Sequence, residues 1–226
     1  IGANLLQKGA RGSGILLSGV PGVIPGRVTV LGGGVVGRNA ARIALGLGAT
    51  VWVVEEDPHR RVHLDDLFEG RAVAIPPHPQ EVADLIRESD LIIGAVARRG
   101  ERSPHLVSRK MVSSMRPGSV VVDVSIDQGG CFETSRPTSH SQPTYIAEGV
   151  VHYCVPNIPG VVPRTSTFAL TGVTLPYILK VASLGFSEAV KTDKGLAKGV
   201  NVYGGEITYS AVAEAFGFRH KTIYLA

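Results

Sequence analysis

The chain has 226 residues, of which 44% are hydrophobic, and a formal net charge of +4. This composition is typical of a globular protein that buries a core, and the scattered Lys and Arg residues argue against nucleic acid as a partner. The two cysteines, Cys131 and Cys154, fit neither a disulfide framework nor a metal site. We predict that both are buried, reduced thiols of a cytoplasmic protein. No apolar run is expected to span a bilayer, so we predict no membrane partner.

Short β-branched runs alternate with helical patterns along most of the chain. The predicted strands cover residues 27–31, 50–54, 71–75, 91–95, 119–124 and 150–154. The predicted helices between them cover residues 35–47, 58–68, 80–88 and 108–115. Asp57 caps the second helix, and Pro58 suits its first position. This alternation predicts an α/β fold of the Rossmann type, a doubly wound parallel sheet that binds ligands at the carboxyl ends of its strands.

Two regions interrupt the alternation. Residues 126–145 form a long polar connection where a helix is expected, and such connections are often functional. The segment 156–159, which begins and ends with proline, is typical of a hinge or domain boundary. We therefore predict a first domain over residues 1–163 and a helical part of a second, split domain over residues 164–226. The second part is too small to hold a core alone.

The carboxyl-terminal part is predicted to be mainly helical. A long apolar helix runs to about Leu184 and is expected to be kinked before Pro176, because proline breaks the helical hydrogen-bond ladder. A short helix is predicted over residues 208–216, with Thr208 as its amino-terminal cap.

Gly32, Gly34 and Gly37 form a G-x-G-x-x-G pattern directly after the first predicted strand. Gly32 suits a tight turn, Gly34 leaves the backbone open for a pyrophosphate, and Gly37 lets the next helix pack close to the strand. The phosphates would face the unpaired N–H groups of the helix that begins near Val35. The pattern alone is a weak signal. The strands and helix around it favour dinucleotide binding over a merely tight turn.

Glu55 stands at the end of the second predicted strand, 18 residues after Gly37. A carboxylate there accepts hydrogen bonds from ribose hydroxyls and repels a 2′-phosphate, so NAD is favoured over NADP. Glu56 adds to the negative field, whereas Arg60 and Arg61, one turn later, soften it. The alternative is that Glu55 is only a solvated acidic strand end.

Asp127 follows the fifth predicted strand, at the sheet edge where ligands bind in this fold. A carboxylate there orients a water or holds an ammonium group, or it caps its own turn, and spacing alone favours neither interpretation. Asp123, inside the strand, is predicted to be buried and structural. His152, on the last strand, is predicted to be a core histidine with its hydrogen bonds satisfied.

Three longer segments resemble the alanine dehydrogenases, part of a larger family shared with the α subunits of proton-pumping nicotinamide nucleotide transhydrogenases. They are DQGGCFETSRPT at 127–138, VHYCVPNIP at 151–159 and VPRTSTFAL at 162–170. The glycine turn, the lead-in at 19–23 and the tail at 195–199 continue the match over essentially all of the chain. The long DQGGCFE-type run and the lack of a membrane segment favour the dehydrogenase branch.

The resemblance implies an oxidoreductase that deaminates L-alanine with NAD to pyruvate, ammonia and NADH, as a homo-oligomer, by resemblance a hexamer. In such enzymes a hydride passes from the substrate Cα to the nicotinamide, and water attacks the resulting imine. The family's catalytic aspartate falls on Asp127, which would position that water. Asn157 falls on the family's asparagine near the nicotinamide and the substrate.

The resemblance and the glycine turn together give a set of expected nucleotide contacts. They are Gly32, Gly34, Val35, Val36, Gly37, Glu55, Arg60, Val96, Ile126, Asp127 and Asn157. Asn157 is also the expected substrate contact. Glu55 departs from the aspartate that is commoner in the family, which places the same charge on a longer arm.

In this family the substrate domain is split around the nucleotide domain. The chain resembles only the part from the connecting helix onward, and residues 1–8 resemble the end of that helix. The amino-terminal half carries the arginine, lysine and histidine that serve the substrate, so we expect this chain to bind NAD but to turn over alanine poorly. Two alternatives stay open, the nucleotide-binding part of a transhydrogenase α subunit and a non-catalytic NAD-binding module.

Overall fold

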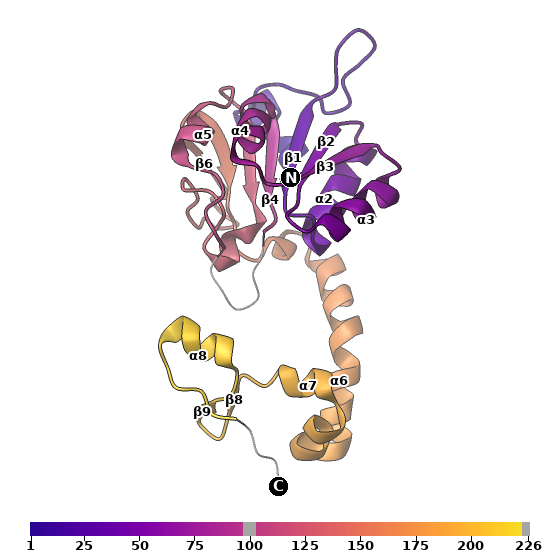
Figure 1. Ribbon diagram of the computed structural model, residues 1–226, viewed down its shortest axis with the longest axis vertical. Helices are drawn as coiled ribbons and strands as arrows, with labels where there is room; N and C mark the ends of the chain where they lie inside the picture. Colours follow the sequence, from indigo (N-terminus) through magenta and orange to yellow (C-terminus); the bar gives the residue numbers. More distant parts are fainter. Residues whose placement is uncertain (97–102, 223–226) are drawn as a thin grey trace. The chain divides into compact units, whose positions relative to one another are not determined.

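The computed structural model of the chain describes residues 1–96 and 103–222. These residues form two compact units, one of residues 1–96 and 103–158 and one of residues 159–222. The first unit is built around a seven-stranded sheet with helices on both faces (Figure 1). The predicted α/β class and doubly wound architecture are confirmed.

The sheet has the strand order β3-β2-β1-β4-β5-β7-β6, in which only β6 is antiparallel to its neighbour. Its strands are β1 (Arg27–Leu31), β2 (Thr50–Val54), β3 (Ala72–Ile75), β4 (Leu91–Gly94), β5 (Val120–Asp123), β6 (Thr144–Ala147) and β7 (Val150–Tyr153). All six predicted strands are present, with ends that differ by no more than one residue. The strand order reverses between β1 and β4, and sheets of this kind bind ligands at such a switch point.

The helices divide between the two faces of the sheet. The first unit contains α1 (Gly2–Leu5), α2 (Val35–Gly46), α3 (Pro58–Phe68), α4 (Pro79–Glu88) and α5 (Arg109–Ser113), with 3-10 turns η1 (Lys8–Ala10) and η2 (Val124–Gln128); a third, η3 (Ile158–Val161), follows β7. One apolar cluster joins α2 and α3 to the sheet, and another joins α4 and α5 to it (Figure 1). Asp57 caps α3 as predicted, because its carboxylate accepts the His59 N–H at 2.9 Å.

The long polar connection ends in a strand that the sequence did not predict. The strand β6 pairs antiparallel with β7 through a two-residue turn at Glu148 and Gly149. Both turn residues have positive φ, 51° and 75°, which matches the right-handed twist of the two strands. The strand β6 therefore forms one edge of the sheet, and η2 begins the same connection at the carboxyl end of β5.

The second unit is described by itself. It contains α6 (Pro163–Thr192), α7 (Lys194–Lys198), α8 (Ser210–Phe216) and a hairpin of β8 (Val202–Tyr203) and β9 (Glu206–Ile207). The hairpin packs on α6 through the stacked rings of Tyr203 in β8 and Phe186 in α6, whose centroids lie 4.9 Å apart.

Two details of this unit bear on the sequence analysis. The helix α6 continues past Pro176 with helical backbone angles and is interrupted at Gly185, where φ is 73° and ψ is 163°, directly after the predicted helix end near Leu184. Glycine alone adopts such angles without strain. Thr208 is not a cap, because α8 begins two residues later and the Thr208 hydroxyl donates to the Val200 carbonyl at 2.9 Å.

The helix α6 also corrects the expectation that no apolar run reaches the length of a bilayer. It has 30 residues and a window of mean hydropathy 1.4, none of which is buried. By length and composition the helix is long and apolar enough to cross a membrane. One such helix is weak evidence for a membrane span, since helices that pack on protein pass the same test.

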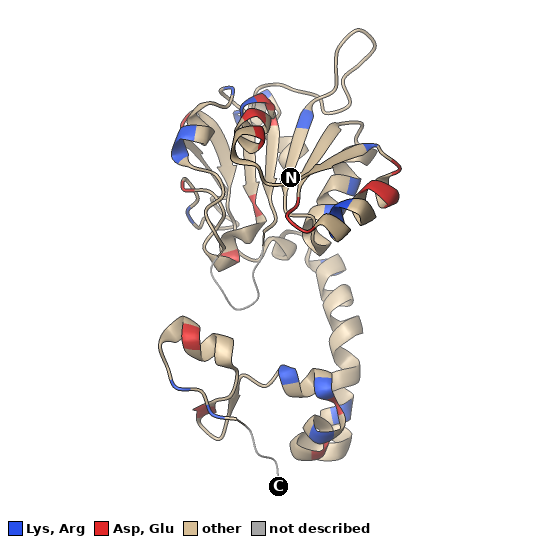
Figure 2. Cartoon of the chain, viewed as in Figure 1, with Lys and Arg blue, Asp and Glu red and all other residues tan. Residues whose placement is uncertain are grey.

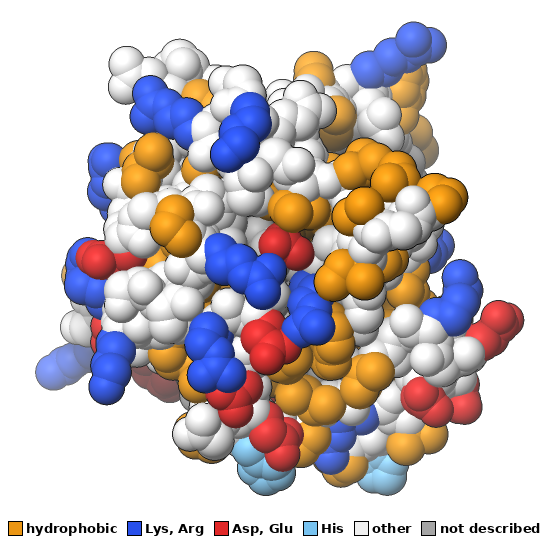
Figure 3. Space-filling view, turned by 90° about the horizontal axis from the view of Figure 1, so that it is seen from above, with side chains coloured by type: hydrophobic (Ala, Val, Ile, Leu, Met, Phe, Trp, Pro, Cys, Tyr) orange, Lys and Arg blue, Asp and Glu red, His pale blue; other side chains and the backbone are white. Residues whose placement is uncertain are grey.

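Charged side chains are mixed in sign over the described residues. Figure 2 shows Lys and Arg among Asp and Glu on the elements of the first unit. Seen from above, basic and acidic side chains lie beside one another on the same face (Figure 3). Ion pairs such as Arg27 with Glu88 and Arg116 with Asp90 account for part of this mixing.

Candidate nucleotide-binding site

The glycine turn between β1 and α2 has three glycines in different environments. A Cβ on Gly37 would lie 1.8 Å from the Gly32 carbonyl oxygen. Gly32 has a φ of 95°, and a Cβ there would lie 2.6 Å from the Ala95 carbonyl oxygen. Around Gly34, by contrast, no atom of the described residues beyond its chain neighbours lies within 4 Å of the position that a Cβ would take. Two glycines are thus required by close packing, and the third borders open space.

The first turn of α2 faces this open space. Gly34 is the N-cap and offers no side chain to the helix. The first bond to that cap runs from the Arg38 N–H to the Gly34 carbonyl at 2.9 Å, so the N–H groups before it have no intrahelical partner. Val35 and Val36 beside them are 68% and 48% exposed. Free N–H groups at the positive end of a helix dipole form a site for an anion.

A cavity of about 330 Å³ lies at this turn, near the β1/β4 switch point. Seven of the expected nucleotide contacts line it, namely Gly32, Gly34, Val35, Val36, Glu55, Arg60 and Val96. The remaining walls are Val54, Glu56, Pro77, Ala95, Pro104 and Leu106. Gly37 lies behind the turn, and Ile126, Asp127 and Asn157 lie outside this cavity.

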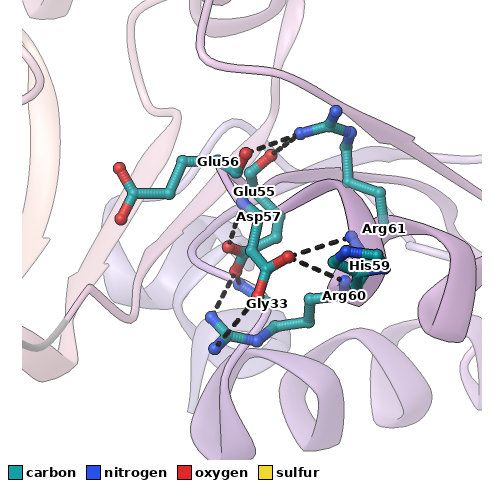
Figure 4. A network of polar contacts seen from close by, with 7 residues as sticks. All are labelled: Gly33, Glu55, Glu56, Asp57, His59, Arg60 and Arg61. Carbon is teal, nitrogen blue, oxygen red and sulfur yellow. Dashed lines mark hydrogen bonds and ion pairs between the residues drawn. The ribbon is translucent and has the colours of Figure 1, made fainter.

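Glu55 is buried at the end of β2, with 4% of its surface exposed. Its Oε2 accepts the Gly33 N–H at 2.7 Å and an Arg60 guanidinium N–H at 3.1 Å, and its Oε1 accepts the Asp57 N–H at 2.9 Å (Figure 4). The carboxylate therefore ties the glycine turn to the start of α3. It is not the solvated strand end that the sequence left open.

Gly33 is a site residue that the motif did not predict, since it occupies a variable position of the pattern. Its N–H is the donor to Glu55, and a Cβ on Gly33 would lie 2.6 Å from Leu64 Cδ1 and 3.0 Å from Glu55 Oε2. The run of three glycines was the available signal for this close approach.

Asp127 and Asn157 meet although 30 residues separate them in the chain. They follow β5 and β7, which are neighbours in the sheet. The Asn157 N–H donates to Asp127 Oδ1 at 3.1 Å, and both residues are exposed. Asn157 has a φ of 53°, a left-handed conformation that asparagine tolerates better than most residues. Ile126 is buried, so a ligand would reach only its backbone.

Asp123 is fully buried at the end of β5, as predicted, and it organises the loop that carries Asp127. Its carboxylate accepts the Ser125 N–H at 3.0 Å, the Cys131 N–H at 2.9 Å and the Ser135 hydroxyl. Burial raises the pKa of the Asp123 carboxyl, and these hydrogen bonds oppose the rise. Burial, with the Asp123 charge beside it, raises the pKa of the Cys131 thiol well above its usual value. Cys131 and Cys154 are both free and buried, which confirms the prediction that they are buried thiols.

His152 is a buried core histidine, as predicted. Its Nε2 lies 2.8 Å from the Thr134 hydroxyl, and its Nδ1 lies 3.0 Å from the Val150 carbonyl oxygen. Its ring stacks on Tyr145 at 5.1 Å. Burial lowers the pKa of His152 below its ordinary value of 6.5. The imidazole is therefore a structural group.

We expect this lowered pKa to weaken the fold on the acid side. Below pH 6.5 a histidine in the unfolded chain takes up a proton that buried His152 does not, so the free energy of unfolding falls until the folded pKa is reached. The variant His152→Gln should show a shallower loss of stability as the pH falls below about 6.5 in urea unfolding. Equal slopes in the two proteins would contradict this assignment.

The fold and the cavity define a dinucleotide-binding α/β domain of the Rossmann type. The chain belongs to the alanine dehydrogenase/PNT family, because its residues 1–210 match the family described as alanine dehydrogenase/PNT, C-terminal domain.

Individual relatives agree with this membership. An alanine dehydrogenase of Halomonas elongata is 56% identical over 219 residues, which are 97% of this chain and 59% of that protein. An alanine dehydrogenase of Staphylococcus haemolyticus is 50% identical over 224 residues, 99% of this chain and 60% of that protein. The chain thus spans about 60% of the length of the curated relatives it matches.

Solved structures give the same picture. A structure of L-alanine dehydrogenase matches with a TM-score of 0.90 at 50% identity, covering 96% of this chain and 60% of that one. A transhydrogenase from Sinorhizobium meliloti matches with a TM-score of 0.56 at 28% identity, covering 62% of this chain and 41% of that one. The chain is therefore more similar to the dehydrogenase than to the transhydrogenase.

Proposed function

We propose that this chain is the NAD-binding part of an alanine dehydrogenase, which deaminates L-alanine oxidatively to pyruvate and ammonia. The observation that carries the proposal is the cavity in which the open side of Gly34, the first turn of α2 and Glu55 meet. The relatives at 50% to 56% identity bear the name alanine dehydrogenase. The reaction is proposed for the whole protein of this family, and nucleotide binding for this chain.

The residues of the cavity fit a dinucleotide. The pyrophosphate would approach the backbone at Gly34 and accept the free N–H groups of α2, and the exposed side chains of Val35 and Val36 offer apolar contact. Glu55 Oε1 accepts one hydrogen bond, from Asp57, which leaves an acceptor position for the ribose 3′-hydroxyl, a group that NAD and NADP share. Acidic residues at this strand end favour NAD over NADP.

The catalytic proposal rests on Asp127 and Asn157. When bound, NAD accepts a hydride from the substrate Cα. Asp127 Oδ1 is held by the Asn157 N–H, whereas Oδ2 has no hydrogen-bond partner among residues 1–96 and 103–222. That oxygen is free to take a proton from the water that attacks the imine, as a general base. The exposed Asn157 amide offers a donor and an acceptor to the substrate or the nicotinamide.

The assembly and location follow from the same resemblance. We propose a homo-oligomer, a hexamer, that works in the cytoplasm on L-alanine or pyruvate. The transhydrogenase alternative has weaker support, since the match to a transhydrogenase structure is at 28% identity. A non-catalytic NAD-binding module would differ from the enzyme in showing no alanine-dependent reaction in any longer form of the protein.

Calorimetric titration of the chain with NAD and with NADP tests the binding proposal. We expect NAD to bind at least about tenfold more tightly, a difference of about 1.4 kcal/mol. An alanine-dependent NADH assay on the same sample then tests how far this chain carries the reaction. We expect slow turnover, because positioning of the substrate supplies much of the rate. Binding of neither nucleotide would overturn the proposed function.

A further inference from the structure

We propose that Glu56 carries the charge that discriminates NAD from NADP in this cavity, and that Glu55 is a positioning residue for the glycine turn. This inference rests on the proposed nucleotide-binding function. Two roles, contact with the bound nucleotide at the glycine turn and repulsion of a 2′-phosphate, usually fall to a single acidic residue at the end of the second strand. Here they are divided between Glu55 and Glu56.

The first step is that Glu55 is already engaged. Its two carboxylate oxygens accept three hydrogen bonds, from Gly33, Asp57 and Arg60. The Arg60 guanidinium lies 3.1 Å from Glu55 Oε2 and neutralises its charge. Only 4% of Glu55 is exposed. A 2′-phosphate entering the cavity would therefore meet a closed ion pair and not a free carboxylate.

The second step is that the two arginines are turned toward protein groups. Arg60 lies between the carboxylates of Glu55 and Asp57, and its Nη2 is 3.9 Å from Asp57 Oδ2. Arg61 donates to the backbone carbonyls of Glu55 and Glu56, both at 2.8 Å. Sites that accept NADP use an arginine near the 2′-phosphate. Here both guanidinium groups are committed to the network in Figure 4.

The third step is that no side chain among residues 1–96 and 103–222 compensates the charge of the Glu56 carboxylate. Glu56 lines the cavity and is exposed. Its carbonyl is held by Arg61, but its carboxylate has no hydrogen-bond or ion-pair partner in the described part of the chain, and it points away from the other six residues in Figure 4. A fixed backbone thus presents one free negative charge at the wall that a 2′-phosphate would approach. Like charges at short range repel strongly when one of them borders a cavity.

Two variants separate these roles. Glu56→Gln removes the free charge and keeps the size of an exposed side chain, so the chain should fold as before. We expect its NAD affinity to stay within about twofold of the wild type and its preference for NAD over NADP to narrow by about tenfold. Glu55→Gln should weaken the binding of both nucleotides by similar factors, because Gly33 loses its charged acceptor. Its preference ratio should stay unchanged.

The titrations include a control variant that changes the net charge by the same amount as Glu56→Gln. Glu81→Gln removes one negative charge from an exposed position of α4 outside the cavity, and it should change neither the affinities nor the ratio. The effect of Glu56→Gln should also shrink in high salt, where an exposed charge is screened.

The outcomes distinguish this inference from the function on which it rests. If the wild-type chain binds NAD and Glu56→Gln leaves the ratio unchanged while Glu55→Gln narrows it, Glu55 holds the discriminating charge and the inference is overturned alone. If the wild-type chain binds neither nucleotide, the proposed function and the inference fail together. The inference is supported if the preference for NAD over NADP narrows in Glu56→Gln and stays unchanged in Glu55→Gln and in the control Glu81→Gln.

Discussion

Replacing Gly34 with alanine should leave the chain folded and weaken its binding of NAD by at least about tenfold. Apart from its chain neighbours, no atom of residues 1–96 and 103–222 lies within 4 Å of the added Cβ, and the backbone angles at Gly34, φ −65° and ψ −167°, suit any residue. The free energy of unfolding should therefore change by less than about 1 kcal/mol. The methyl group would stand in the space through which a pyrophosphate reaches the backbone. Calorimetric titration and urea unfolding of the same protein measure the two effects.

Gly46→Ala is the matched control for this variant. Outside its own helix, Gly46 also has no atom of the described residues within 4 Å of an added Cβ, but it lies in the last turn of α2, away from the cavity. We expect it to bind NAD like the wild type and to be slightly more stable, because alanine favours a helix by up to about 1 kcal/mol over glycine. Wild-type NAD affinity in Gly34→Ala would show that the phosphates do not approach this turn.

Replacing Gly37 with alanine should destabilise the first unit. The added Cβ would lie 1.8 Å from the Gly32 carbonyl oxygen and 2.9 Å from its carbon, so α2 has to move away from β1. Overpacking of this kind lowers the free energy of unfolding by about 1–3 kcal/mol. The variant should also bind NAD more weakly, because the N–H groups of α2 are displaced. Urea unfolding should show a lower midpoint than in Gly34→Ala. An unchanged midpoint would mean that α2 does not rest on the turn as described.

The sequence predicts every strand of the sheet except the edge strand β6. The parallel strands are buried on both faces, so their β-branched runs stand out against the helical segments. The strand β6 was missed because its partner turn uses Glu148 in a left-handed conformation that glutamate rarely adopts. The hairpin of β8 and β9 had a signal that was overlooked, since Gly204 and Gly205 between two short apolar runs are typical of a two-residue turn.

The break in α6 lies at Gly185, one residue beyond the helix end that the sequence predicts near Leu184. Proline removes one hydrogen bond from a helix, and α6 accommodates that loss at Pro176 while its backbone stays helical. Gly185 reaches angles that a side chain forbids, so the helix is broken there.

At the candidate site, the motif predicts the glycine turn but not the hydrogen bond from Gly33 to Glu55 that holds it. The motif positions Gly32, Gly34 and Gly37 follow from spacing. The hydrogen bond from Gly33 to Glu55 depends on the conformation of the Glu55 side chain at the end of β2. The spacing of residues in the sequence does not report that conformation. Likewise, the strand order brings Asp127 to Asn157, and that order is a property of the whole sheet.

The different environments of the turn glycines also govern how this protein can evolve. Every amino acid other than glycine carries a Cβ, so any missense change at Gly32 or Gly37 meets a carbonyl oxygen before its own chemistry matters. Selection for a folded protein is enough to preserve these two positions. At Gly34 a small side chain costs the fold little, so only selection for the ligand keeps the glycine. A descendant that retains the first and last glycines and has lost the middle one would be a domain that has kept its architecture and abandoned its cofactor.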